Sequence, residues 1–163
     1  MIIRREDLQQ TCSILIQTVD ANSLSLVTET LELKTNGNML FMNITNREYY
    51  AQVRIDVGSA ESFHASVNAN LFLKLVAQIT TDTIELTIVD NTLMLKGNGT
   101  YKLPLIFDGE QMLNLPEITI NNVTSEFNID SNILLSILQF NSKELLKGTI
   151  SKPVQKLYYV DEQ

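Results

Sequence analysis

The sequence repeats one order of elements, and this repeat constrains the fold more than any other feature. A short strand over 2–5 precedes an amphipathic helix over 6–19, and the hydrophobic period then changes from 3.6 to 2. Three antiparallel strands are expected next, over 24–34, 39–44 and 49–57. The same order of strand, helix and three strands returns over 63–107. Two copies of one α+β unit are therefore predicted, with both helices on one face of the antiparallel sheets.

Turn and cap signals support both copies. Residues 35–38 predict a hairpin in the first copy, and Asp90-Asn91 predicts one in the second. Asn68 is a good N-cap for a helix over 69–79. The strands expected around that helix are 63–67, 83–89, 93–96 and 100–107.

The spacing of apolar residues predicts which helix residues lie in the core. The first helix is expected to bury Leu8, Cys12, Leu15, Ile16 and Val19. The second is expected to bury Leu71, Phe72, Leu75, Val76 and Ile79. Asn70, Lys74 and Gln78 then face outward.

The pattern starts again after a predicted linker over 108–124. A strand over 126–129 is expected, then a helix capped by Ser131, and a last strand over 154–160 after Pro153. This helix is expected to bury Ile133, Leu134, Ile137, Leu138 and Leu145. The predicted domains are 1–120 and an incomplete second domain over 121–163.

The low numbers of cysteine and histidine exclude several classes of functional site. A single cysteine, Cys12, excludes an intrachain disulfide framework and a thiolate zinc site, and the single histidine, His64, is expected to be an ordinary strand residue. Asp82, Glu85 and Asp90 are expected on the solvent side rather than around a metal. No pair of carboxylates stands beside a nucleophile or base, so neither an enzyme nor a cofactor is expected.

Charge and hydropathy bear on partners and location. The chain has 163 residues and a net charge of −7, which disfavours nucleic acid unless one face gathers the cations. No apolar run approaches the ~20 residues of a membrane-spanning helix. Because the first residues also lack a secretion signal, the cytoplasm is the expected location and no membrane contact is expected.

The order and spacing of hydrophobic residues and turns resemble the first domain of the bacterial DNA polymerase III beta clamp. The stretches that carry the resemblance are 5–8, 24–34, 39–45, 67–76, 83–86, 93–97, 101–104 and 115–118. Residues 126–129, with Pro153-Val154, resemble the start of the second domain of that family. The resemblance covers nearly the whole chain, although it contains no signature motif.

The resemblance implies a ring of six such domains that encircles duplex DNA and tethers a polymerase, with helices lining the hole and sheets outside. Replicative DNA polymerase, a clamp loader and further copies of the chain are the implied partners. Family chains have three domains, so this sequence corresponds to a fragment or to a reduced, phage-type relative. The family's peptide pocket lies between its second and third domains, which this sequence cannot build.

The helix residues that would face the DNA follow from the same resemblance. They are Arg5, Gln9, Gln17, Asn70, Lys74, Gln78, Lys143 and Lys147. The family carries more arginine and lysine on these helices, particularly where this chain has Asn70 and Leu71, so weak contact is expected. Solvated helix side chains remain an alternative explanation for Lys74 and Gln78, and a loop of solvated lysines is an equal alternative for Lys143 and Lys147. The alternative function is a clamp-fold replication protein that binds a partner without encircling DNA.

Overall fold

The computed structural model describes residues 1–19, 25–46, 49–58, 62–116 and 126–141. The chain divides into two compact units, Met1–Ile118 and Thr119–Gln163.

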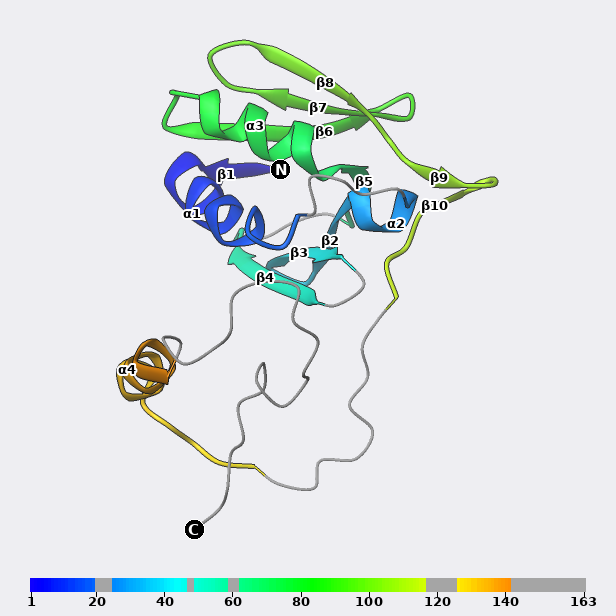
Figure 1. Cartoon of the computed structure of the whole chain (residues 1–163). Helices are drawn as coiled ribbons and strands as arrows, with labels where there is room; N and C mark the ends of the chain where they lie inside the picture. Colours follow the sequence, from blue (N-terminus) through cyan, green and yellow to red (C-terminus); the bar gives the residue numbers. More distant parts are fainter. Residues whose placement is uncertain (20–24, 47–48, 59–61, 117–125, 142–163) are drawn as a thin grey trace. The chain divides into compact units, whose positions relative to one another are not determined.

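The first unit contains the predicted repeat (Figure 1). The first copy consists of β1 (Ile2–Arg4), α1 (Arg5–Leu15), β2 (Thr30–Asn36), β3 (Met39–Thr45) and β4 (Tyr50–Asp56). The second consists of β5 (His64–Asn68), α3 (Ala69–Gln78), β6 (Thr83–Val89), β7 (Thr92–Lys96) and β8 (Thr100–Pro104). A short helix, α2 (Leu26–Glu29), and a small hairpin of β9 (Phe107–Asp108) and β10 (Gln111–Met112) are added to this plan.

Each copy gives its first strand to the sheet of the other copy. One sheet has the order β1-β6-β7-β8, with Ile3 opposite Ile84, and the other has the order β5-β2-β3-β4, with Val67 opposite Leu31. All pairs within these sheets are antiparallel. The two halves are thus related by an approximate two-fold, and neither can complete its sheet without the other.

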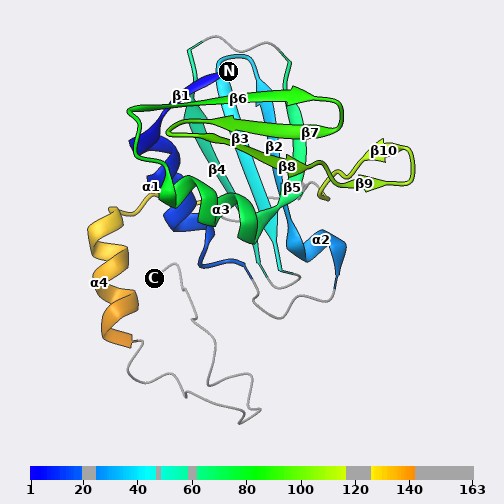
Figure 2. The ribbon, with the colours of Figure 1, turned by 90° about the horizontal axis from the view of Figure 1, so that it is seen from above.

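The two long helices lie side by side, as predicted, and both contact the strands of the sheets (Figures 1 and 2). The result is one core rather than two. Its fully buried centre includes Leu8, Leu15, Leu31, Leu33, Met42, Phe72, Ile84, Leu86 and Leu93. Because burial of large apolar side chains is the main favourable term in folding, the helices and both sheets are stabilised together.

Two hairpins are confirmed by their backbone angles. Gly37 has a φ of 61°, which a residue without a Cβ atom adopts at little cost. Asp90 and Asn91 have φ values of 45° and 58°, the left-handed pair that a type I′ turn requires. Asparagine and aspartate tolerate this conformation because their short side chains form local hydrogen bonds.

The first helix is shorter than predicted, and the strand predicted from residue 24 begins only at Thr30. Helix α1 ends at Leu15, and Ile16 is 50% exposed rather than buried. Residues 26–29 form α2 instead of a strand because two threonines close a local turn. Thr28 Oγ1 donates to the Ser25 carbonyl at 2.9 Å, and Thr30 Oγ1 donates to the Leu26 carbonyl at 2.7 Å. Such local bonds offer the backbone an alternative to the sheet.

The predicted strand over 100–107 ends at Pro104, and residues 108–116 are part of the first unit rather than a linker. The segment is held onto β5: the Ile106 amide donates to the Ser66 carbonyl at 2.7 Å, and Ser66 Oγ donates to the Leu113 carbonyl. Leu113 is 6% exposed. The rest of the predicted linker lies outside the described residues.

A row of polar side chains crosses the sheet of β5, β2, β3 and β4. Glu32 is 4% exposed; its Oε1 lies 3.1 Å from His64 Nε2, and its Oε2 accepts from Asn43 Nδ2 at 2.9 Å. Gln52 Nε2 donates to Asn43 Oδ1 at 3.0 Å. The buried carboxylate is therefore satisfied, which is the condition under which such a group is tolerated. His64 is a strand residue, as predicted.

The described part of the second unit is residues 126–141. Helix α4 (Ser131–Asn141) is capped by Asp130 rather than by Ser131: Asp130 Oδ1 accepts from the Asn132 amide at 2.8 Å. Residues 126–130 form no strand. The helix buries none of its residues, contrary to prediction, because a helix needs a sheet or second helix to cover its apolar side. Leu145 and the predicted strand over 154–160 lie outside the described residues.

Candidate nucleic-acid interface

The candidate site is the outward surface of α1 and α3, called here the helix layer. Asn68 fixes the phase of α3: its Oδ1 accepts from the Leu71 amide at 3.0 Å, as predicted for the N-cap. Ala69, Phe72, Leu73 and Val76 consequently face the core. Lys74 and Gln78 lie on the exposed side, as predicted, and Asn70 is half-buried.

Leu71 was predicted in the core and is 50% exposed. The apolar run of α3 is too long for one face, so hydrophobic periodicity did not decide which of these residues face the core, and Leu71 lies on the outward side. Leu73, which the prediction did not place in the core, is 3% exposed.

Gln9 joins the two helices instead of facing solvent freely. Its Nε2 donates to the Val76 carbonyl at 2.9 Å and to the Ile79 carbonyl at 3.0 Å. These carbonyls lie at the C-terminal end of α3, where the last carbonyls lack the usual partner four residues on; the Val76 carbonyl also accepts from the Ile79 amide at 3.3 Å. The side-chain amide of Gln9, a residue of α1, therefore caps the C-terminal end of α3.

Arg5 is also held by the protein. Its Nη1 donates to the Thr80 carbonyl at 3.3 Å, its Nη2 lies 3.8 Å from Glu6 Oε1, and its side chain is 28% exposed. Its Nε is buried without a hydrogen-bond partner among the described residues. Gln17 is exposed in the turn after α1, and Lys143 and Lys147 lie outside the described residues.

The charge of the helix layer is balanced. Helix α1 contains Arg5, Glu6 and Asp7, and α3 contains Lys74 as its single charged residue. Asp7 Oδ2 accepts from the Nε of Arg4 at 2.8 Å. A layer with as many acidic as basic groups has little attraction for phosphate, because nonspecific affinity for DNA comes from neutralised phosphates.

An apolar groove runs between the helices. It has a volume of about 370 Å³ and is lined by Gln9, Cys12, Ser13, Ile16, Leu73 and Ala77. Burial raises the pKa of Cys12 to about 12, so this thiol stays protonated and unreactive near neutral pH. Two isoleucines that follow Cys12 in the sequence are also exposed: Ile14 is 51% exposed and Ile16 is 50% exposed. The sequence placed Ile16 in the core, so the groove was not predicted.

In the part of the chain that the structure describes, the remaining charged groups form no second site. Glu85 Oε2 lies 3.2 Å from Lys96 Nζ, a cross-strand ion pair on the outer face of the sheet. Within the described residues, no three carboxylate, imidazole or thiol groups gather closely enough to hold a metal ion. None of the helices in the described ranges has the length and apolar character needed to cross a bilayer.

No protein-family model and no curated protein matches this chain. Solved structures of bacterial beta clamps do match its fold. The DNA polymerase III subunit beta of Pseudomonas aeruginosa is 18% identical, with a TM-score of 0.80 over 93% of this chain and 41% of that chain. The Helicobacter pylori beta clamp bound to a DNA ligase peptide is 21% identical, with a TM-score of 0.63 over 73% of this chain and 34% of that one.

Caulobacter crescentus pol III beta is 14% identical, with a TM-score of 0.78 over 91% of this chain and 40% of its own. The chain thus has the α+β fold of the beta clamps, and the predicted fold class is confirmed. It spans less than half the length of these clamp chains.

Proposed function

We propose that this chain is a processivity component of DNA replication that contributes clamp domains to a ring around duplex DNA. The observation that carries the proposal is the strand-exchanged repeat with two helices side by side, which superposes on a P. aeruginosa clamp at a TM-score of 0.80. In the proposed ring, residues 1–120 act as the first clamp domain and residues 121–163 begin the second. Closure then needs further copies or further domains.

The helix layer suits a loose contact with DNA. A clamp must hold the duplex without base-specific or rigid contacts, because these would stop it from sliding. Lys74 supplies positive charge on the exposed side of α3, while Gln78 and Asn70 supply amide groups that water can bridge to phosphate. Gln9 uses both N–H groups of its side-chain amide to hold α1 against α3, whereas Arg5 donates from Nη1 to the Thr80 carbonyl and stays among the proposed DNA-facing residues.

The proposed partners are duplex DNA, the replicative polymerase, a clamp loader and other copies of the chain. The proposed role is non-catalytic and belongs in the cytoplasm. The H. pylori clamp binds a DNA ligase peptide. Peptides from replication enzymes are therefore the proposed form in which partners attach to an assembled ring.

A second candidate is a clamp-fold protein that binds a replication partner without encircling DNA. The balanced charge of α1 and α3, together with the apolar groove beside Ile16, favours it. A surface of this kind resembles a protein-binding groove more than a DNA track.

Retention on circular DNA distinguishes the two candidates. The full chain is incubated with a closed plasmid and passed over a sizing column in salt that removes electrostatic binding. A ring stays with the closed plasmid and slides off after a restriction cut. Equal loss from closed and cut DNA would contradict the ring, and capture of a replication protein that Ile16→Ser abolishes would support the second candidate.

A further inference from the structure

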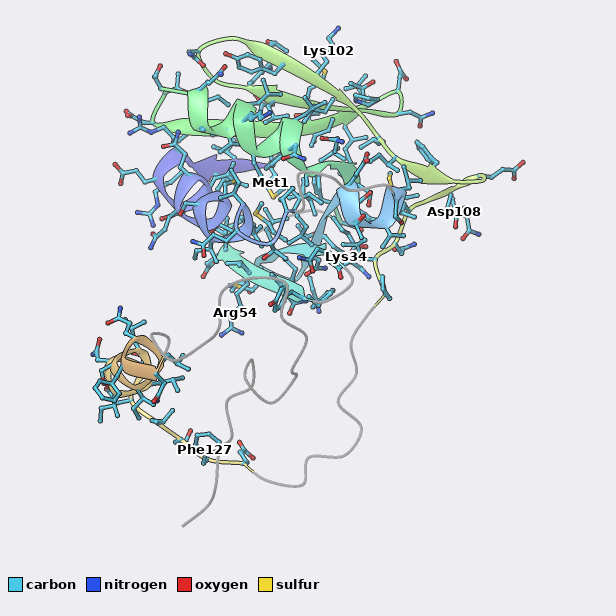
Figure 3. All side chains as sticks on the ribbon, viewed as in Figure 1. Met1, Lys34, Arg54, Lys102, Asp108 and Phe127 are labelled. Atoms are coloured by element: carbon cyan, nitrogen blue, oxygen red, sulfur yellow. The ribbon has the colours of Figure 1, made fainter. Side chains whose placement is uncertain are left out.

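Two sheet edges of the first unit hold equivalent positions but differ in chemistry. Strand β4 is the outer strand of one sheet, and β8 is the outer strand of the other. The approximate two-fold that relates the two halves relates these edges as well. Figure 3 shows Arg54 on β4 and Lys102 on β8.

The hydrogen bonds at the strand ends reveal which backbone groups face outward. The Val57 amide donates to the Asn38 carbonyl at 2.8 Å, and the Asn46 amide donates to the Tyr49 carbonyl at 3.1 Å. Odd-numbered residues along β4 therefore direct their backbone groups toward β3. Because successive residues of a strand alternate, the backbone groups of Gln52, Arg54 and Asp56 face away from the sheet.

The backbone groups of β8 alternate in the same way. The Leu105 amide donates to the Asn91 carbonyl at 2.9 Å, so Lys102 and Pro104 direct their backbone groups outward. Proline has no N–H to donate, and an exposed lysine on an edge disfavours pairing with another strand. The β8 edge is thus protected against association.

The β4 edge contains no proline, and its exposed charges are of opposite sign, so the edge is self-complementary in charge. Arg54 and Asp56 are exposed, of opposite sign and two residues apart, so their side chains lie on the same face. Asp56 Oδ1 accepts from the Gly58 amide at 2.9 Å, which orients the carboxylate. In an antiparallel pair centred on Ile55, Arg54 of each copy lies directly opposite Asp56 of the other.

We propose that β4 is a self-association edge, and that its occupant is β4 of a second copy in this antiparallel register. Arg54 and Asp56 then exchange their outward N–H and C=O groups across the two-fold axis, and two opposite-charge pairs form. A shift that places Arg54 opposite Arg54 of the second copy is disfavoured by repulsion. This charge pattern selects the register.

The helix side of the same edge contributes apolar contact. A groove of about 380 Å³ follows β4, and Ile14, Val53 and Ile55 are the apolar part of its lining; the polar part is Arg4, Asp7, Gln10, Thr11, Arg54 and Asp56. Ile14 is 51% exposed, so a second strand beside β4 covers apolar surface as well as unpaired backbone. The contact is two-fold symmetric and closes on itself, which distinguishes it from a head-to-tail ring contact. It does not rest on DNA binding.

Sedimentation velocity of the full chain over a concentration series tests the proposal. The wild type should dimerise, while Arg54→Asp and Asp56→Arg should each weaken the dimer at least about tenfold, because each replaces two attractions by two repulsions. The two single variants, when mixed, should form a heterodimer, and the double swap Arg54→Asp/Asp56→Arg should restore the homodimer. Lys102→Glu on β8 is the matched control and should leave the dimer unchanged.

Circular dichroism and the thermal midpoint check that every variant is folded, which is expected because both side chains are exposed. A wild type that stays monomeric over the series would overturn the proposal. So would a dimer that Arg54→Asp leaves intact, or two single variants that fail to combine. A dimer that shows no retention on closed DNA leaves this inference standing and counts against the ring alone.

Discussion

A Cβ atom added to Gly97 would lie 2.5 Å from Cγ2 of Ile79, a residue that is 1% exposed. The glycine follows β7, and Ile79 is the C-cap of α3, so the end of the sheet and the end of the helix touch at this point. The same Cβ would lie 3.0 Å from Oγ1 of Thr81. The missing side chain is what allows this close approach.

Gly97→Ala should therefore lower the free energy of unfolding by about 1–3 kcal/mol, the usual cost of overpacking a core. Gly99→Ala is the matched control, since its Cβ would meet no atom closer than 3.7 Å. Urea denaturation of both variants measures the difference. Equal stability of the two variants would contradict the close packing of Gly97 against Ile79.

Gln9→Ala should destabilise the protein by about 1 kcal/mol, because the carbonyls of Val76 and Ile79 lose a donor at the end of α3. Gln10→Ala, one position along the same helix and exposed, should change stability by less than about 0.5 kcal/mol. Thermal unfolding compares the two. If Gln9→Ala instead weakens DNA binding at unchanged stability, Gln9 belongs to the DNA contact.

Stability should fall as the pH rises above 9, and Cys12 should cause part of the fall. An ordinary thiol, as in the unfolded chain, has a pKa of 9.0, whereas burial raises the pKa of Cys12 to about 12. Between these values the unfolded state releases a proton that the folded state keeps, so ionisation favours unfolding. Cys12→Ala should flatten the change in unfolding free energy from pH 8 to pH 10 by about 1 kcal/mol. Parallel profiles for the two proteins would argue against a buried, protonated thiol.

Binding to linear duplex DNA should be weak, and Lys74→Glu should reduce it equally on any sequence, because a phosphate contact carries no base information. The slope of log affinity against log salt should fall by about one for the lost contact. Fluorescence anisotropy at low salt measures both quantities, with Lys102→Glu as a charge-matched control on the sheet. Sequence-selective binding, or equal loss in both variants, would remove Lys74 from the site.

Amide hydrogens of α4 should exchange with solvent much faster than those of α1 and α3. None of the α4 residues is buried, whereas α1 and α3 bury four residues each. Helices of about this length are marginal without tertiary packing, so protection should follow burial. Hydrogen–deuterium exchange on dilute protein measures it. Equal protection in the three helices would show that α4 packs against a surface in solution.

Local signals in the sequence predicted most of the repeat. The Asp90-Asn91 turn and the Asn68 cap are short-range features, and both are confirmed. The helical turn at 26–29 was missed because the hydroxyl bonds of Thr28 and Thr30 compete with strand pairing without changing the hydrophobic pattern. The segment around Leu113 was taken for a linker because its partner, Ser66, lies 47 residues earlier.

The candidate site was only partly predictable for the same reason. The exposure of Lys74 and Gln78 follows from helical spacing, which is local. The hydrogen bond from Gln9 to the Val76 carbonyl forms because α1 packs against α3. The spacing of polar residues along α1 does not predict that bond. The outward position of Leu71 depends on the phase of α3. Only the assembled structure distinguishes a free polar group from one that is already bonded.

The exchange of strands between the two halves also affects how the chain folds during synthesis. Ile3 pairs with Ile84, so β1 leaves the ribosome about 80 residues before its partner strand is made. At roughly 5–20 residues per second, β1 waits several seconds or more with no sheet to join. Pairing over such a separation also raises contact order, which slows folding. Chaperones that shield apolar strands therefore have a defined interval in which to act on this protein, ending when β6 emerges.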